Sequence, residues 1–269
     1  MFKQIVIIEH TGLQNWAIEK LSRYSENKIV IFDNSPKSEE ETLKRIENAD
    51  CVFVSWNTKL TSSILSNTKN LKYIGMCCSL YENQSSNIDI EYCEKNQITV
   101  KGIKNYGDEG LVEFIISELI RLIKGLGEKK WKRNPLELKG RKIGIIGMGT
   151  TGKLLGDRLL AFGSKVFYYS RSLKPIGDGK ILVNTSLGLT FNKLAFDNWI
   201  KNQNNYAIFD GDGIGKHKNE FDNLENIISS DLVSGWTKEA QERLSKKVLE
   251  KVNYFLNEKN KVQTGLQKT

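Results

Sequence analysis

The sequence has no long apolar segment, and it contains only two histidines and three prolines. No run approaches the ~18 consecutive apolar residues of a membrane-spanning helix, so we expect no membrane span. The first residues, MFKQIVIIEHTG, hold one short apolar run and no small-residue cleavage site. They therefore favour a first strand over a signal peptide, and we expect a cytoplasmic protein.

Cysteine is also scarce, and all four cysteines lie in one part of the chain: Cys51, Cys77, Cys78 and Cys93. They lack the paired spacing of metal ligands, and the adjacent Cys77 and Cys78 are poorly placed for chelation or for an ordinary disulfide. With so few histidines to complete a ligand set, we expect no metal site. Reduced, mostly buried thiols are the expectation for a cytoplasmic protein.

The charge is basic but diffuse. The formal net charge is +8, yet the only dense basic cluster is GEKKWKRNP at 127–135, and ERLSKKVLEKV at 242–252 alternates in sign like a solvated helix face. A nucleic-acid-binding protein would concentrate its Lys and Arg in a stripe with aromatic residues between them. Nucleic acid is therefore not an expected partner, and this alternative has little beyond net charge to support it.

Short β-branched runs alternate with segments of helical period through the first hundred residues. We predict strands at 4–9, 28–33, 50–55, 71–77 and 98–103. Strands that alternate with helices indicate an α/β fold with a parallel sheet and helices on both faces. From Asp108 to Leu126 the apolar residues recur at three- and four-residue steps, with acids at the start and bases near the end, which predicts a long bridging helix.

The second half begins with a glycine-rich turn. Gly147, Gly149 and Gly152 match G-x-G-x-x-G between the strand KIGIIG and the helix TTGKLLGDRLLAFG, and a second strand, KVFYYS, follows. The first glycine permits a tight turn, the second permits backbone to approach a diphosphate, and the third permits close packing of helix on strand. With Thr150 and Thr151 at the helix start, these glycines are the expected dinucleotide site. The alternative is an inherited fold that has lost its ligand.

The second strand ends without the Asp or Glu that an NAD site usually presents to the ribose hydroxyls. In its place the loop offers hydroxyl and cationic side chains, namely Ser170, Arg171, Ser172 and Lys174. A cation with hydroxyls suits a 2′-phosphate, so we favour NADP over NAD. A surface loop in a basic protein is the alternative interpretation.

Several segments, in order, resemble the D-isomer-specific 2-hydroxyacid dehydrogenase family. They are YGDEGLVEF (106–114), LKGRKIGIIGMGTTG, ILVNTSLG (181–188) and NIISSDLVSGWTKEAQERL (226–244). The resemblance implies two doubly wound parallel-sheet domains of Rossmann and flavodoxin-like type: residues 1–104 with 237–269, closed by the last helix, and a dinucleotide-binding domain at 105–236. It also implies hydride transfer between nicotinamide and a small 2-oxo or 2-hydroxy acid in the interdomain cleft, a homodimer, and cofactor contacts from Thr185 and Asp210.

The residues that would carry this chemistry are replaced. The family's substrate-binding arginine falls on Leu187, its general acid–base histidine on Leu232, and its carboxylate near Gly215. Leucine neither pairs with a carboxylate nor transfers a proton, so we expect no catalytic residue of the usual set. His217, in one loop with Asp210 and Asp212, is a weak substitute, as are Tyr81, Glu82 and the Cys77–Cys78 pair of the altered substrate loop.

The resemblance also shows a shortened cofactor domain. Only nine residues, RSLKPIGDG, separate the strand ending at Ser170 from the strand starting at Lys180. The family has two further strands here, and one of them lies beside the glycine-turn strand at the centre of the sheet. Either the strand at 180–186 closes this gap or a partner chain fills it. The sequence therefore indicates an NAD(P)-binding oxidoreductase-like protein that does not run the usual 2-hydroxyacid reaction on its unidentified substrate; the alternative is a non-catalytic dinucleotide sensor or scaffold, a pseudoenzyme.

Overall fold

The computed structural model describes residues 1–83, 86–147, 149–169, 177–221 and 223–263. The chain divides into two compact units: Met1–Tyr106 with Gln241–Thr269, and Gly107–Ala240. Each unit is built from parallel strands and helices, so the predicted α/β fold class is confirmed. Within the described residues, no helix has the length and apolar character needed to cross a membrane.

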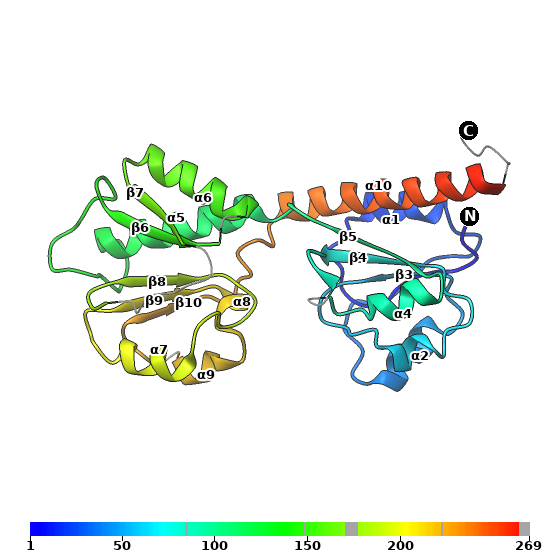
Figure 1. Cartoon of the computed structure of the whole chain (residues 1–269), viewed down its shortest axis with the longest axis horizontal. Coiled ribbons are helices and arrows are strands. Elements are labelled where there is room, and N and C mark those ends of the chain that lie inside the picture. Colours follow the sequence, from blue (N-terminus) through cyan, green and yellow to red (C-terminus); the bar gives the residue numbers. More distant parts are fainter. Residues whose placement is uncertain (84–85, 148, 170–176, 222, 264–269) are drawn as a thin grey trace. The chain divides into compact units, whose positions relative to one another are not determined.

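The first unit contains one five-stranded sheet with the order β2-β1-β3-β4-β5 (Figure 1). All neighbouring strands pair in parallel, and this order is the flavodoxin-like one. The strands are β1 (Ile5–Ile7), β2 (Val30–Ile31), β3 (Cys51–Val54), β4 (Tyr73–Ser79) and β5 (Thr99–Ile103). All five predicted strands are thus present, with ends that differ from the prediction by a few residues.

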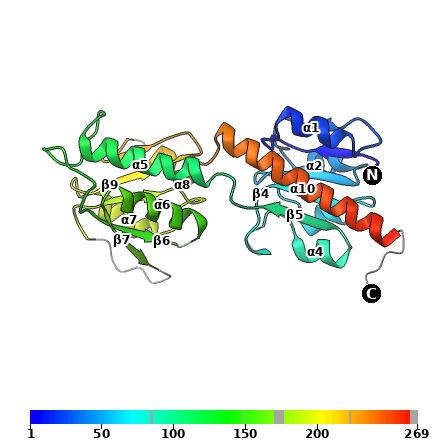
Figure 2. The ribbon, with the colours of Figure 1, turned by 90° about the horizontal axis from the view of Figure 1, so that it is seen from above.

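Helices cover both faces of this sheet, because successive side chains of each strand point to opposite faces and both faces carry apolar residues. Val6 and Ile8 pack on one face into a cluster with Ile46 of α2 (Glu39–Ile46), with α3 (Ser62–Leu65) and with α4 (Ile90–Lys95). On the other face, the ring centroid of Tyr73 lies 4.8 Å from that of Phe255 in α10 (Lys238–Gln263). Helix α10 runs across the same face as α1 (Asn15–Ser22), as the view from above shows (Figure 2).

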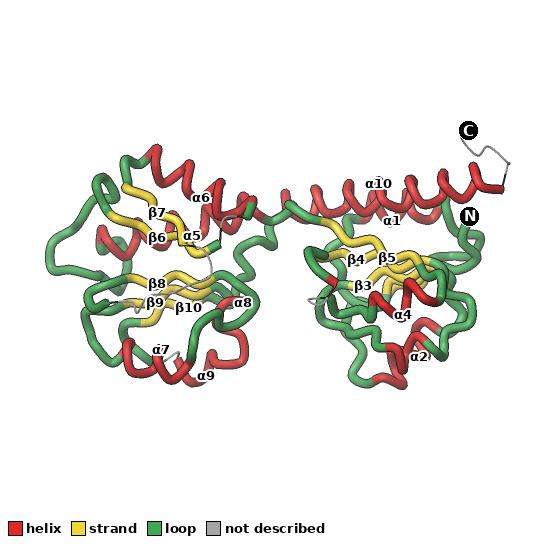
Figure 3. The backbone as a smooth tube through the Cα atoms, viewed as in Figure 1, coloured by secondary structure: helices red, strands yellow, loops and turns green. Residues whose placement is uncertain are grey.

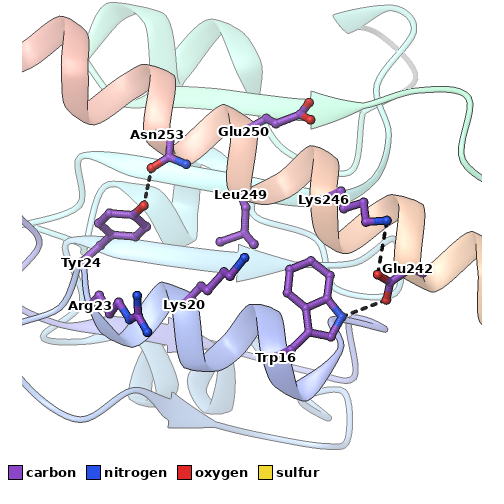
Figure 4. A pocket seen from close by; sticks show the side chains of 9 residues that line it. All are labelled: Trp16, Lys20, Arg23, Tyr24, Glu242, Lys246, Leu249, Glu250 and Asn253. Carbon is purple, nitrogen blue, oxygen red and sulfur yellow. Dashed lines mark hydrogen bonds and ion pairs between the residues drawn. The ribbon is translucent and has the colours of Figure 1, made fainter.

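Polar contacts hold α10 against α1 at both ends of a groove of about 630 Å³ (Figure 4). At one end the indole Nε1 of Trp16 donates to Glu242 Oε2 at 2.8 Å, and the backbone N–H of Gln14 donates to Ser245 Oγ at 2.9 Å. At the other end the hydroxyl of Tyr24 donates to Asn253. These contacts join residues more than 220 positions apart in sequence, so they fix the last helix on the first unit.

The second unit contains two separate sheets, a pair β6-β7 and a triplet β10-β9-β8 (Figure 3). Its strands are β6 (Lys142–Ile146), β7 (Lys165–Tyr169), β8 (Ile181–Asn184), β9 (Tyr206–Phe209) and β10 (Ile227–Ser229). Its helices are α5 (Asp108–Lys124), α6 (Thr150–Ala161), α7 (Lys193–Ile200), α8 (Gly211–Ile214), the 3₁₀ helix η2 (Gly215–His217) and α9 (Lys218–Phe221). In the described chain β8 pairs with β9 alone, so it does not close the central gap; that alternative is wrong.

The long helix α5 gives both sheets a common core. Its residues Ile115 and Leu119 pack in one cluster with Ile145 of β6, Val183 of β8 and Ile208 of β9. A second cluster, built around phenylalanines of α7, β9 and α9, lies on the opposite face of the triplet. The unit is therefore continuous through its side chains although its hydrogen-bonded sheet is interrupted.

Candidate functional site

The glycine turn keeps the geometry that its motif predicts. Gly147 has φ 97°, in the region that favours glycine, and Gly149 is the N-cap of α6 with φ −71°. A Cβ added at Gly149 would meet no atom of the described residues within 4 Å, so these residues leave the space at Gly149 open. A Cβ at Gly152 would lie 2.1 Å from the carbonyl oxygen of Gly147, so this glycine permits α6 to pack on the turn.

The first turn of α6 presents free backbone donors to this open space. The first helical hydrogen bond runs from Lys153 N to Gly149 O at 3.0 Å, so the N–H groups of Thr150, Thr151 and Gly152 have no partner within the helix. Such N–H groups, together with the positive end of the helix dipole, form an anion site. Thr150 is exposed, whereas the hydroxyl of Thr151 donates to the carboxylate of Asp108 at the start of α5.

The residues proposed for the ribose side fall outside the described part of the chain. Strand β7 ends at Tyr169, and Ser170, Arg171, Ser172 and Lys174 follow it there. The preference for NADP therefore stays a prediction.

Thr185 and Asp210, the two further cofactor-site residues, have different surroundings. Thr185 follows β8 and is half-buried. Asp210 is only 1% exposed, and internal donors occupy both carboxylate oxygens. Oδ1 accepts from Gly213 N at 2.8 Å, while Oδ2 accepts from the hydroxyl of Ser234 at 2.6 Å and from its N–H at 3.1 Å. Asp210 thus caps α8 and joins it to the segment after β10.

Leu187 and Leu232 both lie close to the first residues of α8, and they are the residues that the sequence motifs assign to the family's arginine and histidine. The Gly188 N–H donates to Asp212 O and the Gly211 N–H donates to Leu232 O, each at 2.9 Å. Leu187 is 79% exposed and Leu232 is 73% exposed. The backbone therefore presents both positions to solvent, but with side chains that neither bind a carboxylate nor donate a proton.

The prediction that Asp210, Asp212 and His217 share a loop is wrong, because residues 211–221 form the helices α8, η2 and α9. The Asp210 carboxylate starts this helical segment despite its glycines. Burial, and then the charge of Asp210, raises the pKa of Asp212. His217 Nδ1 instead lies 2.9 Å from Glu220 Oε1, and the ring packs against Phe221.

The predicted loop position of Cys77 and Cys78 is wrong, because both residues lie within strand β4. Cys77 and Cys78 are buried, and burial raises the pKa of both thiols, that of Cys78 to about 12. Tyr81 is exposed, and the ammonium of Lys104 lies 5.2 Å from its ring centroid. Among the described residues, no group of three His, Cys, Asp or Glu side chains is placed to hold a metal ion.

Comparison with known proteins decides the family. The family model described as the D-isomer specific 2-hydroxyacid dehydrogenase, catalytic domain, matches residues 5–263. The chain belongs to this family. Among curated relatives, D-3-phosphoglycerate dehydrogenase 1 of Saccharomyces cerevisiae is 31% identical over 150 residues, 52% of this chain and 31% of the relative. The hydroxypyruvate reductase of Thermotoga maritima is 23% identical across 79% of this chain and 87% of the relative.

Alignments with four of the curated relatives, which include the yeast enzyme, span only 31–49% of each relative's length. Solved structures match over more of the chain. An acyclic imino acid reductase (Bsp5) in complex with NADPH and D-Arg has a TM-score of 0.77 at 19% identity, covering 95% of this chain and 97% of that chain. An NAD⁺-bound 3-phosphoglycerate dehydrogenase of Entamoeba histolytica has a TM-score of 0.75 at 20% identity, covering 96% of each chain. At these identities the likeness shows the fold.

Proposed function

We propose that this family member is an oxidoreductase that binds NADP(H) in preference to NAD(H) at the start of α6 and does not catalyse the usual 2-hydroxyacid reaction. The turn around Gly149 supports dinucleotide binding, because the first N–H groups of α6 have no partner within the helix and a Cβ added at Gly149 would meet no atom of the described residues within 4 Å. The loss of the usual reaction rests on one observation, the exposed Leu187 and Leu232 at the family's arginine and histidine positions.

These leucines also point to the substrate. Hydride transfer to a carbonyl carbon leaves an alkoxide, which needs a proton from a group such as histidine. An iminium ion already carries that proton, so hydride transfer from NADPH to its carbon yields the neutral amine and NADP⁺ directly. The substrate class that we propose is therefore an imine, which supports a reaction by positioning alone. The structural likeness to an imino acid reductase solved with NADPH and D-Arg favours the same class.

The test compares a 2-oxo acid alone with the same acid plus an amine. Purified protein and NADPH are mixed with glyoxylate or hydroxypyruvate, with and without methylamine, and NADPH absorbance is followed. We expect NADPH oxidation to depend on the amine, and the oxo acid alone to react ~10²–10⁴-fold more slowly, as expected for a missing general acid. Equal rates with and without amine would refute the imine proposal.

Fluorescence titration with NADPH and NADH tests the cofactor separately. We expect tighter binding of NADPH, and a loss of that preference in Arg171→Ala if the guanidinium holds the 2′-phosphate. Binding of the nucleotide without turnover of any imine would favour the non-catalytic sensor. Binding of neither nucleotide would refute the dinucleotide site and leave a scaffold.

We also propose a cytoplasmic homodimer. In the described residues β6 pairs only with β7, and β8 only with β9, so each strand has an edge that could pair with a second copy. Four unpaired cysteines, all buried, suit a reducing compartment. Sedimentation or solution scattering should give twice the chain mass of 30.7 kDa, and a monomer at micromolar concentration would contradict the dimer.

A further inference from the structure

A carboxylate lies where the proposed site should attract an anion. Helix α5 begins at Asp108 and α6 begins at Thr150, so the first turns of the two helices meet. The hydroxyl of Thr151, the second residue of α6, donates to Asp108 Oδ1. This contact fixes the Asp108 carboxylate beside the N–H groups that would hold a pyrophosphate.

The neighbouring acid does not have the same effect. Glu109 forms an ion pair with Arg158, one turn before the end of α6, so its charge is neutralised and lies away from the glycine turn. No ion pair of Asp108 with a cation occurs among the described residues, and its contact is with a neutral hydroxyl. Asp108 therefore places a carboxylate that no described cation pairs with at the α6 N-terminus.

We infer that Asp108 sets the affinity of the dinucleotide site by opposing the pyrophosphate; this rests on the proposed function. The hydroxyl of Thr151 is two bonds from its Cα, so the Asp108 carboxylate lies within about 9 Å of any phosphate that accepts from the Thr151 N–H. At that distance, and at the effective dielectric constant of a hydrated protein surface, repulsion between the carboxylate and two phosphate charges raises the Kd about tenfold.

The variant Asp108→Asn removes the charge and keeps an acceptor oxygen for Thr151. The matched control is Glu113→Gln, which removes one charge from an exposed position of the same helix, about 7 Å farther along the axis. NADPH is titrated into wild type and both variants at ~0.05 M and ~1 M salt, where the Debye length falls to about 3 Å. Circular dichroism verifies that each variant folds.

We expect Asp108→Asn to bind NADPH about tenfold more tightly than wild type at low salt, with the difference shrinking at high salt and Glu113→Gln unchanged. A second variant, Thr151→Val, releases the carboxylate and should tighten binding in the same direction. If wild type binds NADPH and Asp108→Asn binds equally or more weakly, this inference is wrong and the dinucleotide site stands. If neither protein binds NADPH or NADH, both fail.

Discussion

Substitution by alanine should have different effects at Gly152 and at Gly149, the last two glycines of the motif: the first should lose stability and the second should lose NADPH binding. At Gly152 an added Cβ would lie 2.1 Å from the Gly147 carbonyl oxygen, whereas ordinary contacts are 3.4–4 Å. The clash is with backbone, so the start of α6 or the turn must shift by about 1 Å, and overpacking of this kind costs about 2–3 kcal/mol. For a unit of this size, that loss corresponds to a fall in Tm of about 5–10 °C.

Gly149→Ala should leave stability almost unchanged. Its φ of −71° and ψ of −168° suit any residue, and an added Cβ would meet no atom of the described residues within 4 Å. Alanine at this N-cap costs about 0.5–1 kcal/mol at most, because glycine itself is only a moderate cap. However, the methyl group enters the space that a diphosphate would occupy, so we expect NADPH affinity to fall by at least tenfold.

Two assays separate these effects. Thermal unfolding, with hydrogen–deuterium exchange of peptides from β6 and α6, locates the loss of stability, and NADPH fluorescence reports binding. The expected pattern is destabilisation in Gly152→Ala and intact folding with lost binding in Gly149→Ala. If Gly149→Ala bound NADPH as well as wild type, the ligand would not approach the turn at this residue, and the proposed geometry would be refuted.

Two further predictions concern the first unit. Glu9 is fully buried and accepts hydrogen bonds from Ser55 N, from both the N–H and the hydroxyl of Thr58, and from the hydroxyl of Ser35. Glu9→Leu should therefore lower the free energy of unfolding in urea by roughly 3–5 kcal/mol, and a loss below about 1 kcal/mol would contradict this. Burial raises the pKa of the Cys93 thiol to about 12, so folded thiols stay protonated at a pH where unfolded thiols, with a pKa of about 8.5, ionise. The contribution of the buried thiols to the free energy of unfolding should therefore be fully present below about pH 8.5 and decline as the pH rises above it. A thiol reagent at pH 8 should label the protein only after unfolding, and rapid labelling of the native protein would refute the burial argument.

The strands and the long helix could be read from the sequence because their signals are local. The apolar run at Cys51–Val54 is buried along its whole length, as expected for a strand covered on both faces, and the 108–126 pattern became α5 almost to its ends. The helices of 211–221 were missed, since three glycines hide the helical period. Asp210 immediately before them is a capping signal that could have revealed the first of these helices.

The sequence indicated a shortened cofactor domain but left open whether the strand at 180–186 closes the gap, and it gave no sign of the Asp108 contact. Asp108 and Thr151 are 43 residues apart on two helices, so only the packing of α5 on α6 brings them together. The packing of α5 also explains why the described part of this unit has a common core although β6 and β8 do not pair. Apolar residues of β6, β8 and β9 each meet α5, and the helix therefore replaces, through side chains, a connection that backbone hydrogen bonds would otherwise make.

The two halves of the proposed site depend on different parts of the chain, and this decides which half can survive divergence. Pyrophosphate binding at the proposed site would use backbone N–H groups and small residues, so it would persist as long as Gly149 and Gly152 keep α6 on the turn. Proton transfer and carboxylate binding use side chains alone, so the replacements that we propose at Leu187 and Leu232 would remove them without disturbing the fold that presents those positions. Under the proposed function, the protein keeps a hydride carrier but lacks the family's usual proton donor, and we therefore expect it to favour a substrate that arrives already protonated.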